Sequence, residues 1–217
     1  AGGKVLHKLL ENNNLLRDDI VKTVVTGYGR VSADFADKVV TEITCHPKGG
    51  YYLNNEIRTI IDIGGQDSKA ISLGQGGKVI DFIMNDKCAA GTGKFLEVTI
   101  NSLGESIDKL DEITEDVEAA NINSMCTVFA ESEVVSLLAR GASKESVALG
   151  IIDSIADRAN ILLGKVPVHS KIMFTGGLAR SEKIKNYLSQ KVGEEVITSD
   201  FSQLAGAIGA AVIGGQN

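Results

Sequence analysis

The segment 62–67 carries the clearest chemistry in the sequence, because Asp62 ends an apolar stretch and Gly64 and Gly65 follow it. Glycines let backbone N–H groups approach an anion without a Cβ atom in the way, and neighbouring N–H groups can point together at one phosphate. An aspartate at a strand end can hold Mg²⁺ through the water shell of the ion. The segment therefore predicts a phosphate-binding turn, with an ordinary hairpin whose glycines have positive φ as the alternative.

A second pair of glycines, Gly176 and Gly177, follows another apolar stretch and opens a predicted helix, where a nucleotide can bind at the helix N-terminus. The predicted helix over 203–211 consists mostly of small residues, which lets another helix approach closely, and tight packing explains most of its positions. The Walker pattern Gly-x-x-x-x-Gly-Lys-Ser/Thr is absent from the sequence. The phosphate turn is therefore not that of a P-loop enzyme.

Two cysteines, Cys88 and Cys126, each stand just before a predicted helix. A helix N-terminus lowers the pKa of a thiol and stabilises a thiolate, which suits a ligand of an iron-sulfur cluster. A 4Fe-4S cluster takes four thiolates, so two subunits of a twofold dimer, each giving these two, would complete one cluster between them. Buried, inert thiols are the alternative. The pair Cys45 and His46 lacks the further spaced ligands of a zinc site.

The composition predicts a globular protein without a nucleic-acid or membrane partner. The chain has 217 residues, 43% of them hydrophobic, enough for one domain or two small lobes. Its 28 acidic and 22 basic residues give a net charge of -6, which does not favour binding of a polyanion such as nucleic acid. We expect a cytoplasmic location, since the sequence has no apolar stretch of about 20 residues and no signal pattern, and three cysteines are too few for a disulfide framework.

The hydrophobic pattern predicts an α/β fold. Three strands over 58–63, 69–73 and 78–84 are expected to form an antiparallel meander. A break is expected at 45–50, where Pro47 is followed by two glycines. The other predicted elements are helices over 4–12, 93–103, 127–139, 145–163, 180–191 and 203–213, a helical stretch through Asp34 and Glu42, and strands over 21–26, 171–174 and 195–198. A hinge near residue 86 would divide the chain into lobes 1–86 and 87–217.

Together these motifs make the chain resemble the activator (archerase) component of 2-hydroxyacyl-CoA dehydratases. That component is part of the BadF/BadG/BcrA/BcrD ATPase family, which includes benzoyl-CoA reductase subunits, within the actin, Hsp70 and hexokinase superfamily. Three units of the sequence resemble, in order, the superfamily's second phosphate, adenosine and second connecting motifs. They are a strand followed by Asp and Gly-Gly, a strand followed by Gly-Gly and a helix, and a helix of small residues. The segments that carry the resemblance are 26–30, 62–69, 85–95, 126–134 and 175–179.

The resemblance implies an actin-like (ribonuclease H-like) ATPase fold of two lobes and a homodimer that bridges one 4Fe-4S cluster. It implies that Cys88 and Cys126 ligate iron, and that an electron passes from ferredoxin or flavodoxin to the dehydratase as ATP is hydrolysed. Asp62 and Gln66 would be catalytic. The residues implied to bind ATP or ADP and Mg²⁺ are Asp62, Gly64, Gly65, Gln66 and Asp67 at the phosphates, Gly176, Gly177, Leu178 and Ala179 along the nucleotide, and Gln203 at the base.

One feature of the family is not found in this sequence. The family begins with a strand and a first phosphate turn of the form Asp-x-Gly-Ser-Thr-x-Thr-Lys, so we expect the first lobe to lack its N-terminal strands and ATP binding to be weaker. Pro47 also stands where a small, helix-compatible residue is expected. Two other functions stay open: a small-molecule kinase of the same superfamily with inert cysteines, and a regulatory ATP-binding module without catalysis.

Overall fold

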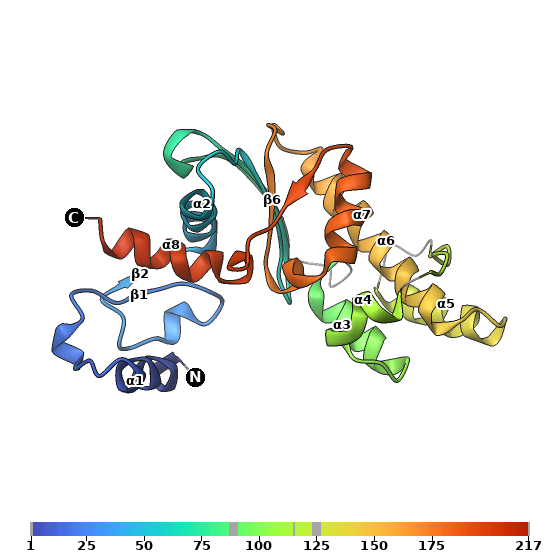
Figure 1. Cartoon of the computed structure of the whole chain (residues 1–217), viewed down its shortest axis with the longest axis horizontal. Coiled ribbons are helices and arrows are strands. Elements are labelled where there is room, and N and C mark those ends of the chain that lie inside the picture. Colours follow the sequence, from blue (N-terminus) through green and yellow to red (C-terminus); the bar gives the residue numbers. More distant parts are fainter. Residues whose placement is uncertain (1, 87–90, 115, 123–126, 217) are drawn as a thin grey trace.

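A computed structural model describes residues 2–86, 91–114, 116–122 and 127–216 of the chain. At its centre lies a five-stranded mixed sheet in the order β5-β4-β3-β6-β7 (Figure 1). The strands are β3 (Thr59–Ile63), β4 (Ser68–Leu73), β5 (Val79–Asn85), β6 (Ile172–Thr175) and β7 (Val196–Ile197). The predicted meander is confirmed, since β3, β4 and β5 pair antiparallel in chain order, while β6 joins β3 in parallel.

Both faces of the sheet are covered, which explains why every residue of β3 and β4 is buried. Ile60, Ile71 and Met173 share one apolar cluster with Leu53 of α2 (Glu42–Leu53). Ile61 and Phe174 face the other way, into the larger cluster formed with α3, α6 and α7. Figure 1 shows α2 and α8 on one side of the sheet and α6 and α7 on the other.

The helices agree with the predictions to within two residues at their ends. They are α1 (Gly2–Asn12), α3 (Gly93–Ser102), α5 (Thr127–Ala139), α6 (Lys144–Leu163), α7 (Glu182–Val192) and α8 (Ala205–Gly214), with the short α4 (Leu110–Ile113) in addition. Short 3₁₀ turns are η1 (Arg17–Asp19), η2 (Arg30–Ser32), η3 (Gln75–Gly77), η4 (Ile107–Lys109), η5 (Gly177–Arg180) and η6 (Ser202–Leu204). Within the described part of the chain, no helix is long and apolar enough to cross a membrane.

The predicted break at 45–50 is wrong, because α2 continues through Pro47. The glycines that suggested a break serve packing against other elements instead. A Cβ atom on Gly49 would lie 1.8 Å from the carbonyl oxygen of Ala205 in α8, and one on Gly50 would lie 2.8 Å from Cδ1 of Ile60 in the sheet. Contacts with α8 and the sheet therefore override the local helix-breaking tendency of this segment.

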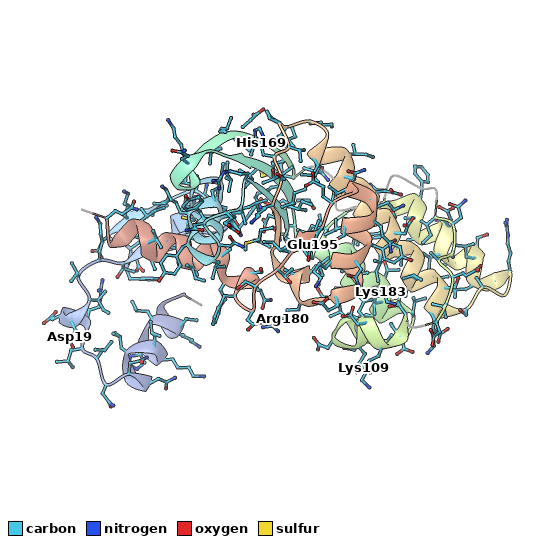
Figure 2. All side chains as sticks on the ribbon, turned by 45° about the horizontal axis from the view of Figure 1, so that its top comes forward. Asp19, Lys109, His169, Arg180, Lys183 and Glu195 are labelled. Atoms are coloured by element: carbon cyan, nitrogen blue, oxygen red, sulfur yellow. The ribbon has the colours of Figure 1, made fainter. Side chains whose placement is uncertain are left out.

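The N-terminal part is less regular than predicted. The expected strand over 21–26 is only β1 (Val24–Val25), paired in parallel with β2 (Lys38–Val39), and α8 packs on β1. The helical stretch expected through Asp34 is wrong: η2 and β2 occupy this segment, and α2 begins only at Glu42. His7 and His169 are both exposed, and the latter is labelled in Figure 2 in the loop before β6. The sheet takes strands from both sides of residue 86, and the lobe boundary there stays a prediction.

Candidate functional site

The strand register places Asp62 at the centre of the site. Asp62 is opposite Lys69 in the β3–β4 pair and opposite Thr175 in the β3–β6 pair. Its side chain is 2% exposed, and it accepts hydrogen bonds from Thr175 Oγ1 at 2.9 Å and from Lys69 Nζ at 3.1 Å. A third group, His46 Nε2 of α2, lies 3.3 Å from Asp62 Oδ1. Hydrogen-bond donors on two strands and the imidazole of α2 thus surround this carboxylate.

Lys69 is a buried cation behind the phosphate turn. Its side chain is 2% exposed, and Nζ bridges Asp62 and Asp67, with 2.6 Å to Asp67 Oδ1. Burial alone would raise the pKa of Asp62, but His46 and Lys69, together with the hydrogen bonds from Lys69 and Thr175, lower it below its ordinary value. Burial would lower the pKa of Lys69, and the two carboxylates raise it instead. Asp62 and Lys69 are therefore both charged at neutral pH.

The depressed pKa of Asp62 predicts a specific loss of stability in acid. A carboxylate with a lower pKa in the folded than in the unfolded state stabilises the fold above the unfolded value, and this contribution disappears as the pH falls through the folded value. The free energy of unfolding should thus fall below about pH 4. In Asp62→Asn this part of the decline should be missing, which urea denaturation at several pH values measures. Parallel curves for the two proteins would contradict the assignment.

The turn after β3 is closed by a hydrogen bond from Gly64 N to Asp67 O of 2.9 Å. Neither Gly64 nor Gly65 has a positive φ, so the ordinary-hairpin alternative does not explain the glycines. A Cβ on Gly64 would lie 2.8 Å from Asp67 Oδ1, whereas one on Gly65 would meet nothing within 4 Å. The missing side chain at Gly65 therefore leaves its backbone open to the adjoining cavity.

That cavity, which we call the phosphate cavity, has a volume of about 240 Å³. It brings together six of the predicted residues, Asp62, Gly64, Gly65, Gln66, Asp67 and Gly176. Its other lining residues are Tyr28, Glu42, His46 and Lys69. None of these four residues was predicted to belong to the site. Tyr28 and Lys69 lie in the segments 26–30 and 62–69, which carry the family resemblance, so the sequence held a signal for them. His46 and Glu42 line the cavity only because α2 packs next to the turn.

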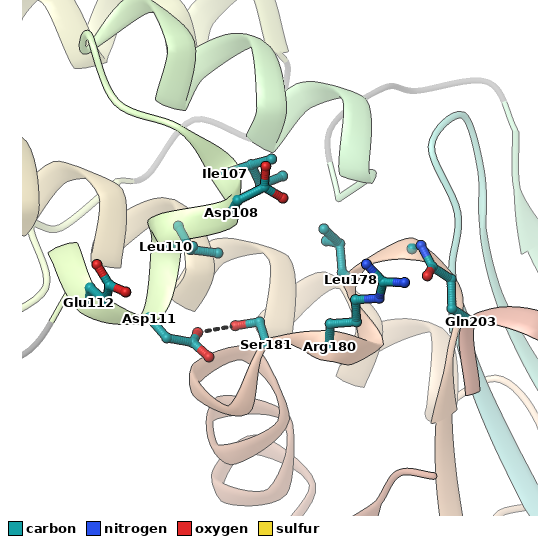
Figure 3. A pocket seen from close by; sticks show the side chains of 10 residues that line it. Ile107, Asp108, Leu110, Asp111, Glu112, Leu178, Arg180, Ser181 and Gln203 are labelled. Carbon is teal, nitrogen blue, oxygen red and sulfur yellow. Dashed lines mark hydrogen bonds between the residues drawn. The ribbon is translucent and has the colours of Figure 1, made fainter. Parts of the chain in front are cut away.

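A second cavity has a volume of about 470 Å³ and is lined by Gly177, the residue after Gly176. Gly177, Leu178 and Gln203 are the predicted residues that line it, and Figure 3 shows Asp108 on one side and Arg180 with Gln203 on the other. Ala179 packs into the apolar core instead. The second cavity, at about 470 Å³, is in the range of small-molecule sites, about 300–1,000 Å³.

Gly176 lines the phosphate cavity and admits no side chain. Its φ is +95°, and a Cβ atom would lie 2.2 Å from the carbonyl oxygen of Ile63. The close approach of β6 to the end of β3 depends on this glycine. The helix that follows is not open to a ligand at its first amides, however, because Asp111 accepts from Glu182 N at 2.9 Å and Lys183 N at 3.3 Å. Ahead of these amides, Gly177, Leu178, Arg180 and Ser181 line the second cavity.

Asp111 should therefore stabilise α7. It also accepts from Ser181 Oγ (Figure 3), so Asp111→Ala leaves three donors without this partner. We expect the free energy of unfolding to fall by about 1–2 kcal/mol, as for loss of a charged helix cap. Urea denaturation measures the change, and Glu112→Ala, the exposed next residue, is the matched control. Equal stability of the two variants would show that the cap contributes nothing.

Cys88 and Cys126 lie outside the described residues. Among the residues that are described, no group of three or more His, Cys, Asp or Glu side chains could hold a metal ion. Cys45 is buried in α2, where burial raises the pKa of its thiol. The segment after Cys88 is nevertheless attached to the phosphate turn: Gly93 N donates to Gly64 O at 2.8 Å and Lys94 N to Gly65 O at 3.0 Å.

Paired glycine turns at the ends of parallel strands β3 and β6, with α2 and α8 crossing on one face, define an actin-like ATPase fold. The chain belongs to the BadF/BadG/BcrA/BcrD ATPase family, whose model matches residues 3–214. It is 50% identical over 190 residues to the uncharacterized protein YjiL of Escherichia coli, covering 88% of this chain and 74% of that protein. It is 43% identical over 210 residues to a 2-hydroxyisocaproyl-CoA dehydratase activator of Clostridioides difficile, covering 96% and 79%.

Solved structures agree with this assignment. The activator of 2-hydroxyisocaproyl-CoA dehydratase from Clostridium difficile with bound ADPNP has a TM-score of 0.93 and 42% identity, covering 98% of this chain and 80% of its own. Component A of (R)-2-hydroxyglutaryl-CoA dehydratase from Acidaminococcus fermentans has a TM-score of 0.93 and 39% identity, covering 98% and 82%. The ethanolamine utilization protein EutJ of Carboxydothermus hydrogenoformans, at 15% identity and a TM-score of 0.60 (97% and 73% covered), shares the fold alone.

Proposed function

We propose that this chain is an ATP-dependent activator that passes a low-potential electron to a 2-hydroxyacyl-CoA dehydratase. Ferredoxin or flavodoxin would supply the electron, and one 4Fe-4S cluster, bridging a homodimer through Cys88 and Cys126 of each subunit, would carry it. The observation that carries the proposal is the phosphate cavity around Asp62 in a chain 43% identical to a named activator. The cysteines in segments 85–95 and 126–134 distinguish it from a kinase of the same superfamily.

The phosphate cavity fits the phosphates of ATP with Mg²⁺. The turn 64–67 lines the cavity, and because the N–H group of Gly64 is bonded to Asp67 O, the N–H groups of Gly65 and Gln66 would receive the phosphates. Asp62 already accepts from two hydrogen-bond donors and lies against His46, out of about four lone-pair positions on a carboxylate. This leaves a position at which Asp62 would hold a water of the magnesium shell. Gln66, exposed beside it, would orient the attacking water.

Hydrogen bonds of the described residues also support coupling between ATP and the electron carrier. The phosphate turn holds Gly93 and Lys94 through the carbonyls of Gly64 and Gly65, and Ser68 Oγ donates to Gly91 O at 2.5 Å. Gly91 follows Cys88 by three positions in the chain. A shift of the turn upon ATP binding or hydrolysis would move this segment directly. Such a movement would link the ATP cycle to the cluster, as an activator requires.

Anaerobic purification with iron and sulfide analysis tests the proposal. We expect four iron atoms per dimer and loss of the cluster absorption in Cys88→Ala and in Cys126→Ala, with Cys45→Ala as the matched cysteine control. The wild-type protein should also hydrolyse ATP and support dehydratase activity in the presence of reduced ferredoxin. Unchanged iron in Cys88→Ala would contradict the bridging cluster. ATP consumption that depends on a sugar or acid and is indifferent to oxygen would instead identify a small-molecule kinase.

A further inference from the structure

His46 is a polar side chain in the phosphate cavity that the function proposed above leaves without a role. It lies on α2, its side chain is 12% exposed, and Nε2 is 3.3 Å from Asp62 Oδ1. Thr175 and Lys69, which donate hydrogen bonds to Asp62, belong to the same sheet as Asp62 itself. His46 therefore connects a different layer of the molecule to this carboxylate.

The position of the imidazole ring is fixed by α8. A Cβ atom on Gly206 would lie 3.0 Å from Cε1 and 3.4 Å from both ring nitrogens of His46, so the bare glycine makes the space that the ring fills. On either side of this contact, Gly49 approaches the backbone of α8 and Gly209 approaches the backbone of α2, each so closely that a Cβ atom would lie 1.8 Å from a carbonyl oxygen. The helix pair and the imidazole thus form one packed unit.

We propose that His46 is a positioning residue that couples the α2–α8 helix pair to Asp62. The inference rests on the proposed function, in which Asp62 holds a water of the magnesium shell. A carboxylate with this task must keep one orientation, and His46 fixes its Oδ1 from the helix side. Any relative movement of the helix pair and the sheet during the ATP cycle then alters the position of Asp62. His46 accordingly affects turnover and the contribution of Mg²⁺, and has little effect on the affinity for nucleotide without metal.

Three substitutions separate this role from a structural one. His46→Ala removes the imidazole, His46→Gln keeps a polar group that can reach Asp62, and Gly206→Ala displaces an unaltered imidazole. Gly215→Ala, near the end of the same helix where a Cβ would meet nothing closer than 3.8 Å, is the control. The measurements are kcat and KM for ATP, the dissociation constant of ADP with and without Mg²⁺, and thermal unfolding, all on the protein expressed from its whole gene.

We expect kcat to fall about 10- to 100-fold in His46→Ala and Gly206→Ala, the usual effect of losing a residue that orients a metal-associated ligand. His46→Gln should regain most of this loss, and Gly215→Ala should match the wild type. The dissociation constant of ADP without Mg²⁺ should stay within about twofold, which a general disturbance of the site would not allow. Should His46→Ala fail to fold, Gly206→Ala and His46→Gln decide the matter by the same measurements.

Asp62→Asn provides the final distinction. If His46 acts through Asp62, adding His46→Ala to Asp62→Asn should reduce kcat no further, because residues that act as one unit are not additive. An equal loss in both backgrounds would overturn the inference, as would wild-type kcat in His46→Ala. Either result leaves the proposed function intact. A wild-type protein that neither binds nor hydrolyses ATP would overturn the proposed function and this inference with it.

Discussion

Gly209→Ala should lower the free energy of unfolding by about 3 kcal/mol, at the upper end of the usual cost of overpacking. The added Cβ atom would lie 1.8 Å from the carbonyl oxygen of Cys45 and 2.8 Å from the backbone nitrogen of Gly49. Both atoms belong to the backbone of α2, so no side-chain rotation relieves the contact and the helices must separate. Alanine is the better helix former by about 1 kcal/mol, which offsets only part of this cost.

Urea denaturation of Gly209→Ala and of Gly215→Ala measures the effect. Gly215 also lies at the end of α8, with a φ of -82°, and a Cβ there would be at ordinary contact distances. We expect Gly215→Ala to stay within about 0.5 kcal/mol of the wild type, as surface substitutions usually do. Since a domain of this kind has only about 5–15 kcal/mol of stability, the difference should be plain. Equal midpoints for the two variants would show that the helices separate without cost.

The close contact between α2 and α8 also explains which part of the fold could not be predicted from the sequence. Strands 58–63, 69–73 and 78–84 have strong local signals, and the turns between them are short, so the meander follows from the sequence. Pro47, Gly49 and Gly50 also have strong local signals, for a break, and these are misleading. Their environment is provided by Ala205 and Gly209, some 155 residues further along the chain, and by the sheet. A contact of that range leaves no trace in local periodicity.

The site likewise contains residues that local sequence rules predict and residues that only the tertiary packing reveals. The turn around Gly64 and the glycine at 176 follow from local rules, since a close approach of backbone to backbone or to an anion calls for glycine. His46 reaches the site only through the packing of α2. Lys69 is buried against the general tendency of lysine to be exposed, and only the register that sets it opposite Asp62 reveals its role. The described residues do not include Cys88 and Cys126, so their role as iron ligands stays a prediction.

Lys69→Met should be the most harmful of the substitutions at the phosphate turn. Methionine resembles the lysine chain in volume, but the ammonium group that bridges Asp62 and Asp67 is lost. Removing one partner of a buried ion pair leaves an uncompensated charge and costs about 3–5 kcal/mol. Asp62 is only 2% exposed, so keeping it ionised without Lys69 should cost stability, and ATP hydrolysis should fall as well. Asp67→Asn, at the more exposed end of the bridge, should have a smaller effect.

The pH dependence separates the loss of charge from the loss of packing. Without Lys69 the pKa of Asp62 in the folded state must rise, because burial continues to favour the neutral acid and one of the groups that opposed it is gone. In the folded state, Asp62 then takes up a proton at a higher pH in Lys69→Met than in the wild type. The difference in free energy of unfolding between the wild type and Lys69→Met should therefore shrink as the pH is lowered toward about 4. Urea denaturation at pH 8, 6 and 4.5 measures this difference. A penalty that stays constant with pH would mean that Lys69 contributes through packing alone, and the electrostatic account of Asp62 would then have to be given up.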